Sequence, residues 1–246
     1  NPAGAAVHLV GVAGGAMTVV QGSGASPVVQ MWTGEGSDTI LDRLTITGGF
    51  TESSGGGLSL NSVSPTLAHL RVVGNEAVDG GGGIAAWHSQ PLLEDVEITG
   101  NVAGSYGGGV LVSGPTSDLQ VTGGSFTGNE AWRGGGVAVL DGAAASMDDV
   151  VVFDNEGEKG AGLYVEDAGG LTVTGGSIQS NQALDRGGGL WLEYSLLTMS
   201  GVTLANNTAW WGGGASIHHA DDALLDGLQV EGNQASTGGG VSFFAS

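Results

Sequence analysis

The chain contains no cysteine among its 246 residues. Disulfide bonds, thiol nucleophiles and thiolate metal sites are therefore excluded. The missing cysteines do not identify the compartment, because proteins outside the cell are permitted disulfides but do not require them.

Basic residues are scarce as well. Five Lys and Arg stand against 25 Asp and Glu, which gives a formal net charge of −20 at pH 7. Nucleic acids and anionic membranes are recognised through basic patches, so we expect neither as a partner. The negative charge is compatible with bound cations, or simply with solubility.

The first twenty residues lack the marks of a signal peptide or a membrane span. They are fairly apolar, but glycines interrupt them and they contain no basic n-region. We therefore expect no direct membrane insertion by this chain. It also lacks an initiator Met, and we expect it to be an excised or processed piece of a longer protein.

Glycine is abundant, at 50 residues, but lacks the three-residue period of collagen. Glycine triplets recur about every 26 residues, with Ala in the middle of the fifth, and they begin at Gly55, Gly81, Gly107, Gly134, Gly160, Gly187, Gly212 and Gly238. An Asn precedes all but the first by five or six residues, at Asn75, Asn101, Asn129, Asn155, Asn181, Asn207 and Asn233. A fixed period of this length is typical of a repeat architecture.

Residues 92–115 illustrate one repeat. Residues 92–99 alternate apolar and polar side chains in their second half, as a half-buried strand does. The pattern then predicts a turn, a short crossing over 102–106, and a second strand over 110–112. Such short strands become stable when each pairs with its copy one coil away, about 4.8 Å along the axis. The period suits a three-sided coil.

Two apolar columns predict the core. The residue after each triplet and the residue two positions later are apolar in all eight coils, at Leu58, Ile84, Val110, Val137, Leu163, Leu190, Ala215 and Val241, and at Leu60, Ala86, Val112, Val139, Val165, Leu192, Ile217 and Phe243. The recurrence of Asn also has a structural explanation, because stacked Asn side chains form hydrogen bonds with each other. A small residue follows each Asn by two positions, which suggests a tight inward corner.

The sequence therefore predicts an all-β chain that folds as a right-handed parallel β-helix solenoid, with about 26 residues per coil and roughly nine to ten coils. We expect one domain over 1–246. Residues 55–246 form the regular coils in this prediction, and residues 1–54 form irregular N-terminal coils. The regular part ends just after a triplet strand, so we expect further coils, a cap or a partner beyond Ser246.

Within the irregular N-terminal part, the pattern predicts strands at 7–10, 17–20 and 28–32. Residues 44–49 fit the strand and turn of the repeat, with Gly49 at the position of the Asn.

Phe126-Thr127-Gly128-Asn129, followed by Gly134-Gly135-Gly136-Val137, resembles the paired FxxN and GGA[ILV] motifs of polymorphic outer-membrane-protein repeats. Those repeats belong to the wider pectate-lyase-like β-helix group. The resemblance covers roughly 39–246 and implies a bacterial surface or secreted protein, often an adhesin-like passenger. Polysaccharide lyases and hydrolases share this fold, so the resemblance does not decide between binding and catalysis.

One outward column carries acidic residues. Counting four positions from each triplet places Glu166, Glu193 and His218 on consecutive strands. One interpretation is a carboxylate pair that binds Ca²⁺ or shares a proton, with His218 as ligand or base, and with Tyr164 and Trp191 as a sugar-stacking platform. The other is a solvated acidic face, in which like charges cost only about 1 kcal/mol in water.

A second column holds the residue just before each triplet. Three of the five basic residues fall here in consecutive coils between two aromatic residues, giving Tyr106, Arg133, Lys159, Arg186 and Trp211. Trp132 and Trp210 extend the aromatic surface. One interpretation is a groove for an acidic glycan, and the other is charge pairing and cation–π packing at an exposed corner, each worth about 0.5–1 kcal/mol.

These patterns favour a secreted or cell-surface module, extracellular or on the outer surface of a bacterium. It acts as an adhesin-like or structural passenger and binds a polysaccharide or cell-surface glycan through the Tyr106–Trp211 column. The alternative is a polysaccharide lyase or glycoside hydrolase acting on an acidic polysaccharide, with Glu166, Glu193 and His218 as catalytic groups. A purely structural spacer is the third reading. No cofactor is expected beyond Ca²⁺ at Glu166 and Glu193.

Overall fold

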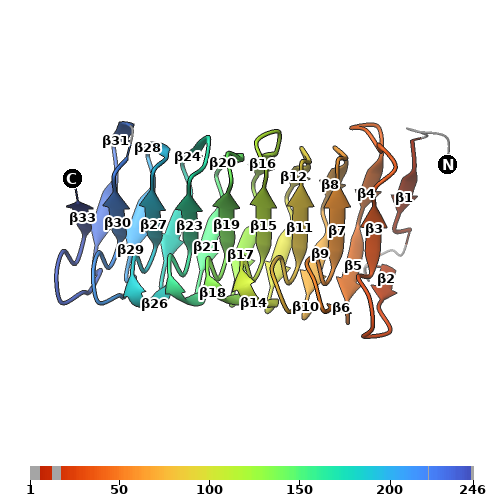
Figure 1. Cartoon of the computed structure of the whole chain (residues 1–246), viewed down its shortest axis with the longest axis horizontal. Helices are drawn as coiled ribbons and strands as arrows, with labels where there is room; N and C mark the ends of the chain where they lie inside the picture. Colours follow the sequence, from red (N-terminus) through yellow and green to blue (C-terminus); the bar gives the residue numbers. More distant parts are fainter. Residues whose placement is uncertain (1–5, 13–17, 221, 245–246) are drawn as a thin grey trace.

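The computed structural model describes residues 6–12, 18–220 and 222–244. This part of the chain forms a spiral of about nine turns in which all the strand pairs are parallel, and it contains no helix. Figure 1 shows the coils following one another along a single long axis, with the two termini at opposite ends. The described part of the chain accordingly contains no helix long and apolar enough to cross a membrane. The predicted β-helix is confirmed.

Each coil between residues 40 and 193 visits four sheets, which we number in the order in which the chain meets them. In the last two coils, isolated bridges at Thr208, Trp211, Gln234 and Thr237 take the place of a strand in sheet 3. Sheet 1 consists of β1 (His8–Val10), β4 (Ile40–Asp42), β8 (Thr66–Ala68), β12 (Leu92–Glu94), β16 (Asp118–Thr122), β20 (Ala144–Asp148), β24 (Gly170–Thr174), β28 (Leu196–Ser200) and β31 (Asp222–Asp226). Sheet 2 consists of β2 (Thr18–Gln21), β5 (Leu44–Thr47), β9 (Arg71–Val73), β13 (Glu97–Thr99), β17 (Ser125–Thr127), β21 (Val151–Phe153), β25 (Ser177–Gln179), β29 (Thr203–Ala205) and β32 (Gln229–Glu231).

Sheets 3 and 4 complete the coil. Sheet 3 is shorter and consists of β6 (Phe50–Thr51), β10 (Glu76–Ala77), β14 (Val102–Tyr106), β18 (Glu130–Arg133), β22 (Glu156–Lys159) and β26 (Gln182–Arg186). Sheet 4 consists of β3 (Val29–Met31), β7 (Leu58–Asn61), β11 (Ile84–Trp87), β15 (Val110–Ser113), β19 (Val137–Leu140), β23 (Leu163–Glu166), β27 (Leu190–Glu193), β30 (Ala215–His218) and β33 (Val241–Phe244).

Two details of the predicted coil were wrong. The stretch 92–99 is two strands, because Asp95 adopts a left-handed conformation (φ 48°) and turns the chain between β12 and β13. The expected crossing over 102–106 is itself a strand, β14, so the coil has a fourth sheet where three sides were predicted. Stacking explains this strand, since Val102 and Ala103 pair with both neighbouring coils.

The predicted strands near the N-terminus are present as β1, β2 and β3. Met17, included in the second prediction, lies outside the described residues. Gly49 takes the Asn position as predicted, and its backbone N–H donates to Asn75 Oδ1 at 3.0 Å.

The two apolar columns form the core. Seven members of each column are buried, and their side chains fill the space between the sheets. In β33, however, Val241 is only half-buried and Phe243 is 61% exposed, although both keep the inward register of the preceding strand. Burial of these columns is the main stabilising term, at about 25 cal/mol per Å² of apolar surface.

The Asn column lies inside the coil, buried except at the half-buried Asn233, and forms a continuous hydrogen-bonded ladder. In each of six steps the Asn Nδ2 donates to the Oδ1 of the Asn in the next coil, at 2.9–3.0 Å. The same amide group also donates to a backbone carbonyl, as Asn129 does to Ile98 O at 2.9 Å. The left-handed turn lies at the residue before the Asn, such as Gly128 (φ 59°).

Backbone crowding explains the second glycine of the triplet. A Cβ atom on Gly108 would lie 2.3 Å from Glu130 O and 2.6 Å from Gly135 O of the next coil. In the one coil with Ala at this position, Ala161, the inward Ala of the neighbouring corner is replaced by Gly157. A Cβ on Gly157 would lie 3.6 Å from Ala161 Cα, so the two exceptions adjoin each other.

Candidate functional site

The residues of the basic column are neighbours in successive coils, as the period predicted. Arg133 pairs in register with Tyr106 on one side and Lys159 on the other, and Lys159 pairs with Arg186. A bridge from Arg186 continues the column to Trp211. Sheet 3 and its continuation therefore hold five cationic and aromatic side chains along one edge of the coil.

The acidic column is also continuous. Glu166 on β23 pairs in register with Glu193 on β27, and Glu193 pairs with His218 on β30. Parallel in-register strands bring these three side chains to one row of sheet 4, at the end of each strand.

The two columns meet at one face, a relation that the sequence did not reveal. Arg133 Nη1 donates to the Tyr106 hydroxyl at 2.9 Å and lies 3.7 Å from Glu166 Oε2. The hydroxyl of Tyr164 donates to the same carboxylate oxygen at 2.8 Å. Glu166 is thus held by a cation from the corner and a phenol from its own strand.

Tyr164 and Trp191 lie beneath the cations rather than on the surface. Their rings stack at 4.5 Å between centroids, and only 0% and 2% of the two residues are exposed. The sugar-stacking platform predicted for them is therefore wrong, because no ligand ring can reach these faces. They serve as a packed floor to the basic column.

Each cation of the column lies over an aromatic ring. The Arg133 guanidinium carbon is 5.6 Å from the Tyr164 centroid, and Lys159 Nζ is 5.5 Å from the Trp191 centroid. In the next coil the Arg186 guanidinium carbon is 4.9 Å from the ring of Trp211. These contacts fix the three cations in place while part of each stays in water, since each of the three residues is only half-buried.

Local electrostatics favour the charged form of Arg133. Burial lowers the pKa of Arg133, but Tyr164, Tyr106 and Glu166 outweigh it and raise the pKa overall. Burial and the bond to Glu166 raise the pKa of Tyr164, so that phenol stays protonated. Among the ion pairs in the described part of the chain, Arg133 and Arg186 each have one carboxylate within 4.0 Å and Lys159 has none.

Glu166 and Glu193 have few neighbouring side chains that could help them coordinate a metal ion. Within residues 6–12, 18–220 and 222–244, no group of three or more His, Asp or Glu side chains could hold one. Calcium takes six to eight oxygen ligands, so Glu166 and Glu193 alone supply too few. The Ca²⁺ site therefore stays a prediction without a built ligand set.

His218 is buried, with 6% of the residue exposed. Its Nε2 lies 2.9 Å from Ser216 Oγ, and its ring stacks on Phe244 at 4.4 Å between centroids. Burial lowers the pKa of His218, and Arg186 and other nearby cations lower it further. The imidazole is thus neutral and covered, which suits packing better than proton transfer to a substrate.

This shift predicts a pH effect on stability. Below the ordinary pKa of 6.5 the unfolded chain takes up a proton at His218 that the folded chain resists, so the free energy of unfolding should fall as pH falls below 6.5. Urea unfolding of the wild type and His218→Gln on both sides of that pH measures this. The variant should lose part of the acid sensitivity, whereas His8→Gln, at an exposed His, should retain all of it.

A groove of about 400 Å³ opens at the Tyr106 end of the column. Aromatic and acidic side chains line it, chiefly Trp87, Tyr106, Asp79, Asp141, Glu166 and Asp167. Ser113 Oγ donates to Asp141 Oδ2 at 2.6 Å. Sequence reasoning identified Glu166 but did not connect Asp79 to it, because Asp79 lies in another coil, in the segment between β10 and β11.

The two outer tryptophans are placed differently. Trp210 packs edge-on against Trp211, with centroids 6.4 Å apart, and therefore does extend the aromatic end of the column. Trp132 points elsewhere and lines a separate groove on sheet 3. Both side chains are more than half exposed, at 57% and 55%.

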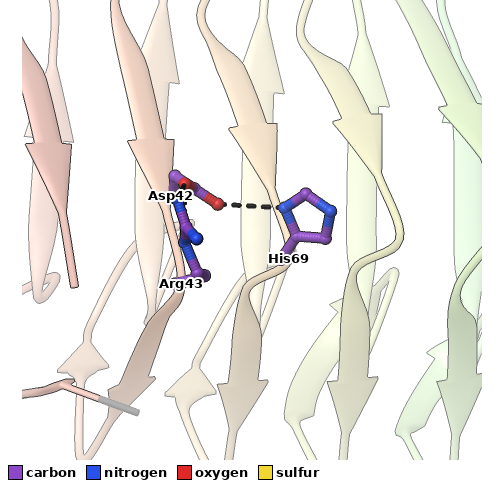
Figure 2. A network of polar contacts seen from close by, with 3 residues as sticks. All are labelled: Asp42, Arg43 and His69. Carbon is purple, nitrogen blue, oxygen red and sulfur yellow. Dashed lines mark hydrogen bonds and ion pairs between the residues drawn. The ribbon is translucent and has the colours of Figure 1, made fainter. Parts of the chain in front are cut away.

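Another polar cluster lies far from this face, near the N-terminal end of the coil. Figure 2 shows Asp42 facing His69 of the next coil, with Asp42 Oδ1 and His69 Nδ1 2.9 Å apart. Arg43 Nε donates to the other carboxylate oxygen at 2.9 Å. Burial raises the pKa of Asp42, but the bonds from His69 and Arg43 outweigh it and lower the pKa. This is a surface ion pair at a bend.

Comparison with protein families gives one match. The family model described as "Right handed beta helix region" matches residues 79–245. The match supports the pectate-lyase-like group expected from the sequence, without distinguishing the polymorphic outer-membrane-protein repeats within it. No curated protein and no solved structure matches the chain.

Proposed function

The chain belongs to the right handed beta helix region family, and on that premise we propose that it is a non-enzymatic module that binds an acidic polysaccharide along its basic column. One observation carries the proposal. Three of the five basic residues of a chain with net charge −20 stand in consecutive coils on one edge, as Arg133, Lys159 and Arg186.

The arrangement fits an extended polyanion. Successive cations repeat at the coil spacing of about 4.8 Å, which is similar to the length of one sugar residue. Stacking on Tyr164, Trp191 and Trp211 holds them in advance, so binding orders few side chains. The acidic surface elsewhere repels a polyanion, which restricts it to this edge.

The resemblance of the Phe126–Val137 motifs to polymorphic outer-membrane-protein repeats supports a location for this module. We place it outside the cell or on the outer surface of a bacterium, as an adhesin-like passenger. A stiff spiral of about nine turns suits the display of a binding edge away from a membrane.

A glycoside hydrolase or lyase acting on an acidic polysaccharide is the second candidate, and the groove beside Tyr106 favours it. Glycoside hydrolysis needs two carboxyl groups flanking the bond that breaks. The groove brings Glu166, Asp141 and Asp167 to one wall, with Trp87 available to a sugar ring. Glu193 and His218 do not line this groove, so Glu166 is the member of the predicted set that fits best.

One experiment tests both candidates. The protein is incubated with immobilised polyuronate and with a neutral polysaccharide, with and without Ca²⁺, and both retention and new chain ends are measured. We expect retention on polyuronate and no cleavage. A triple variant, Arg133→Gln, Lys159→Gln and Arg186→Gln, should bind about a hundredfold more weakly if each cation contributes about 1 kcal/mol.

The matched control changes the two basic residues outside the column. Arg43→Ala with Arg71→Ala removes exposed cations and should leave retention unchanged. Equal losses of retention in the triple Gln variant and in this control would contradict specific binding at the basic column. New chain ends that disappear in Glu166→Gln would establish the enzyme instead, and neither retention nor cleavage on any polysaccharide would favour a structural spacer.

A further inference from the structure

A second groove lies on the outward side of sheet 3. It has a volume of about 450 Å³, and its lining includes Val102, Trp132, Leu184, Glu130, Glu156 and Glu158. Arg133 and Lys159, which belong to the basic column, do not line it. This groove is thus separate from the face assigned to an acidic polysaccharide.

Large apolar side chains are unusually exposed here. Leu184 is 75% exposed, Trp132 55% and Val102 40%. Trp132 and Leu184 stand two coils apart, roughly 10 Å at the strand spacing. They form two apolar walls, and Gly157, in the coil between them, leaves that part of the floor without a side chain.

The groove is also acidic. Glu130 and Glu156 pair in register on β18 and β22, and half-buried Glu158 lies between the two apolar walls. None of the ion pairs found among residues 6–12, 18–220 and 222–244 includes these three carboxylates. Two features therefore coincide in one hollow, namely exposed apolar walls and carboxylates without a cationic partner.

We propose that this groove docks a Lys- or Arg-bearing, otherwise apolar segment of another protein. A long basic side chain has an apolar stem and a charged head. The stem fits between Trp132 and Leu184, while the head reaches Glu158 and the face of the Trp132 indole. The net charge of −20 steers such a partner to the molecule, and the carboxylates in the groove select it.

The same carboxylates repel an acidic glycan, so this groove and the basic column prefer ligands of opposite charge. This makes the proposal independent of the function proposed above. The triple Gln variant of the basic column should bind a cationic peptide no more weakly than the wild type does.

The probe is the capped peptide Lys-Leu-Lys-Leu-Lys, titrated into the whole chain at low ionic strength, with affinity measured by calorimetry. We expect binding that weakens about tenfold in Trp132→Ala and again in the double variant Glu156→Gln with Glu158→Gln. The matched control is Trp210→Ala, which removes an equally exposed indole outside the groove and should leave the affinity unchanged.

Two results would overturn the inference. Equal peptide affinity in the wild type, Trp132→Ala and the double Gln variant would mean diffuse attraction to an acidic surface. A neutral oligosaccharide that binds at Trp132 while the peptide does not would assign the groove to sugars. All the altered side chains are exposed or half-buried, and an unchanged circular dichroism spectrum would confirm that each variant is folded.

Discussion

A Gly108→Ala variant should lose most of its stability. The added Cβ would lie 2.3 Å from Glu130 O and 2.6 Å from Gly135 O, and both atoms belong to the backbone of the next coil. Neither carbonyl can rotate away without breaking the ladder in which it takes part. We expect a loss of at least about 3 kcal/mol in the free energy of unfolding, measured by urea denaturation.

Gly100→Ala is the control for this variant. Gly100 has φ 61° and nothing within 4 Å of an added Cβ, so Ala there meets conformational strain without a clash. We expect a cost of about 1–2 kcal/mol for that strain. A Gly108→Ala loss no larger than the Gly100→Ala loss would contradict the role assigned to backbone crowding.

The chain itself suggests how the clash is relieved. Ala161 occupies the same triplet position as Gly108, and its coil has Gly157 where coil 102–109 has Ala103. Combining Ala103→Gly with Gly108→Ala reproduces that pairing. We expect the double variant to regain only part of the lost stability, because Ala103→Gly leaves the Glu130 and Gly135 carbonyls in place; any gain is a coupling between neighbouring positions. If the double variant is no more stable than Gly108→Ala, Ala161 is accommodated for another reason.

Replacing Asn129 by Ala should be nearly as damaging. The change removes four hydrogen bonds, since Asn129 Nδ2 donates to Ile98 O and Asn155 Oδ1 while Asn129 Oδ1 accepts from Asn101 N and Nδ2. The groups left behind are buried, and each unpaired one costs about 1–3 kcal/mol. We expect a loss of at least about 3 kcal/mol in the free energy of unfolding.

Asn61→Ala is the comparison for the ladder. Asn61 is exposed and its side-chain oxygen accepts a bond only from the adjacent Ser62 hydroxyl in the described part of the chain, at 3.0 Å. The change should alter the free energy of unfolding by no more than about 0.5 kcal/mol. Similar losses for Asn61→Ala and Asn129→Ala would refute the ladder as a source of stability.

The period of the sequence was sufficient to predict the spiral and its core. Residues such as Val110 and Val112 recur at fixed distances from the triplets, and stacking converts that spacing into vertical neighbours. The period also brought Glu166 beside Glu193 and Arg133 beside Lys159, as the register confirms. Contacts between equivalent residues of successive coils can therefore be predicted from the sequence.

Contacts between side chains of different sheets could not be predicted from the sequence, because they depend on the angle at which the chain turns at each corner. The sequence did not show that Arg133 reaches Glu166, which lies in the next coil on another sheet. It also placed Tyr164 and Trp191 on the surface, since a strand pattern gives the side of the sheet but not what covers it. The bend at Asp95 and the strand β14 were missed for a related reason, because both arise from stacking rather than local preference.

The interior Asn ladder gives the spiral a direction. Between its two end members, each side-chain amide of the ladder donates to the C-terminal neighbour and accepts from the N-terminal one, as Asn101 does with Asn129 and Asn75. Aligned amide dipoles polarise one another and strengthen each bond by roughly 10–30%. Breaking the Asn ladder near its midpoint leaves two shorter ladders, and their hydrogen bonds together stabilise the fold less than those of the intact ladder. Each half of a broken ladder should therefore stabilise the fold by less than half as much as the intact ladder does.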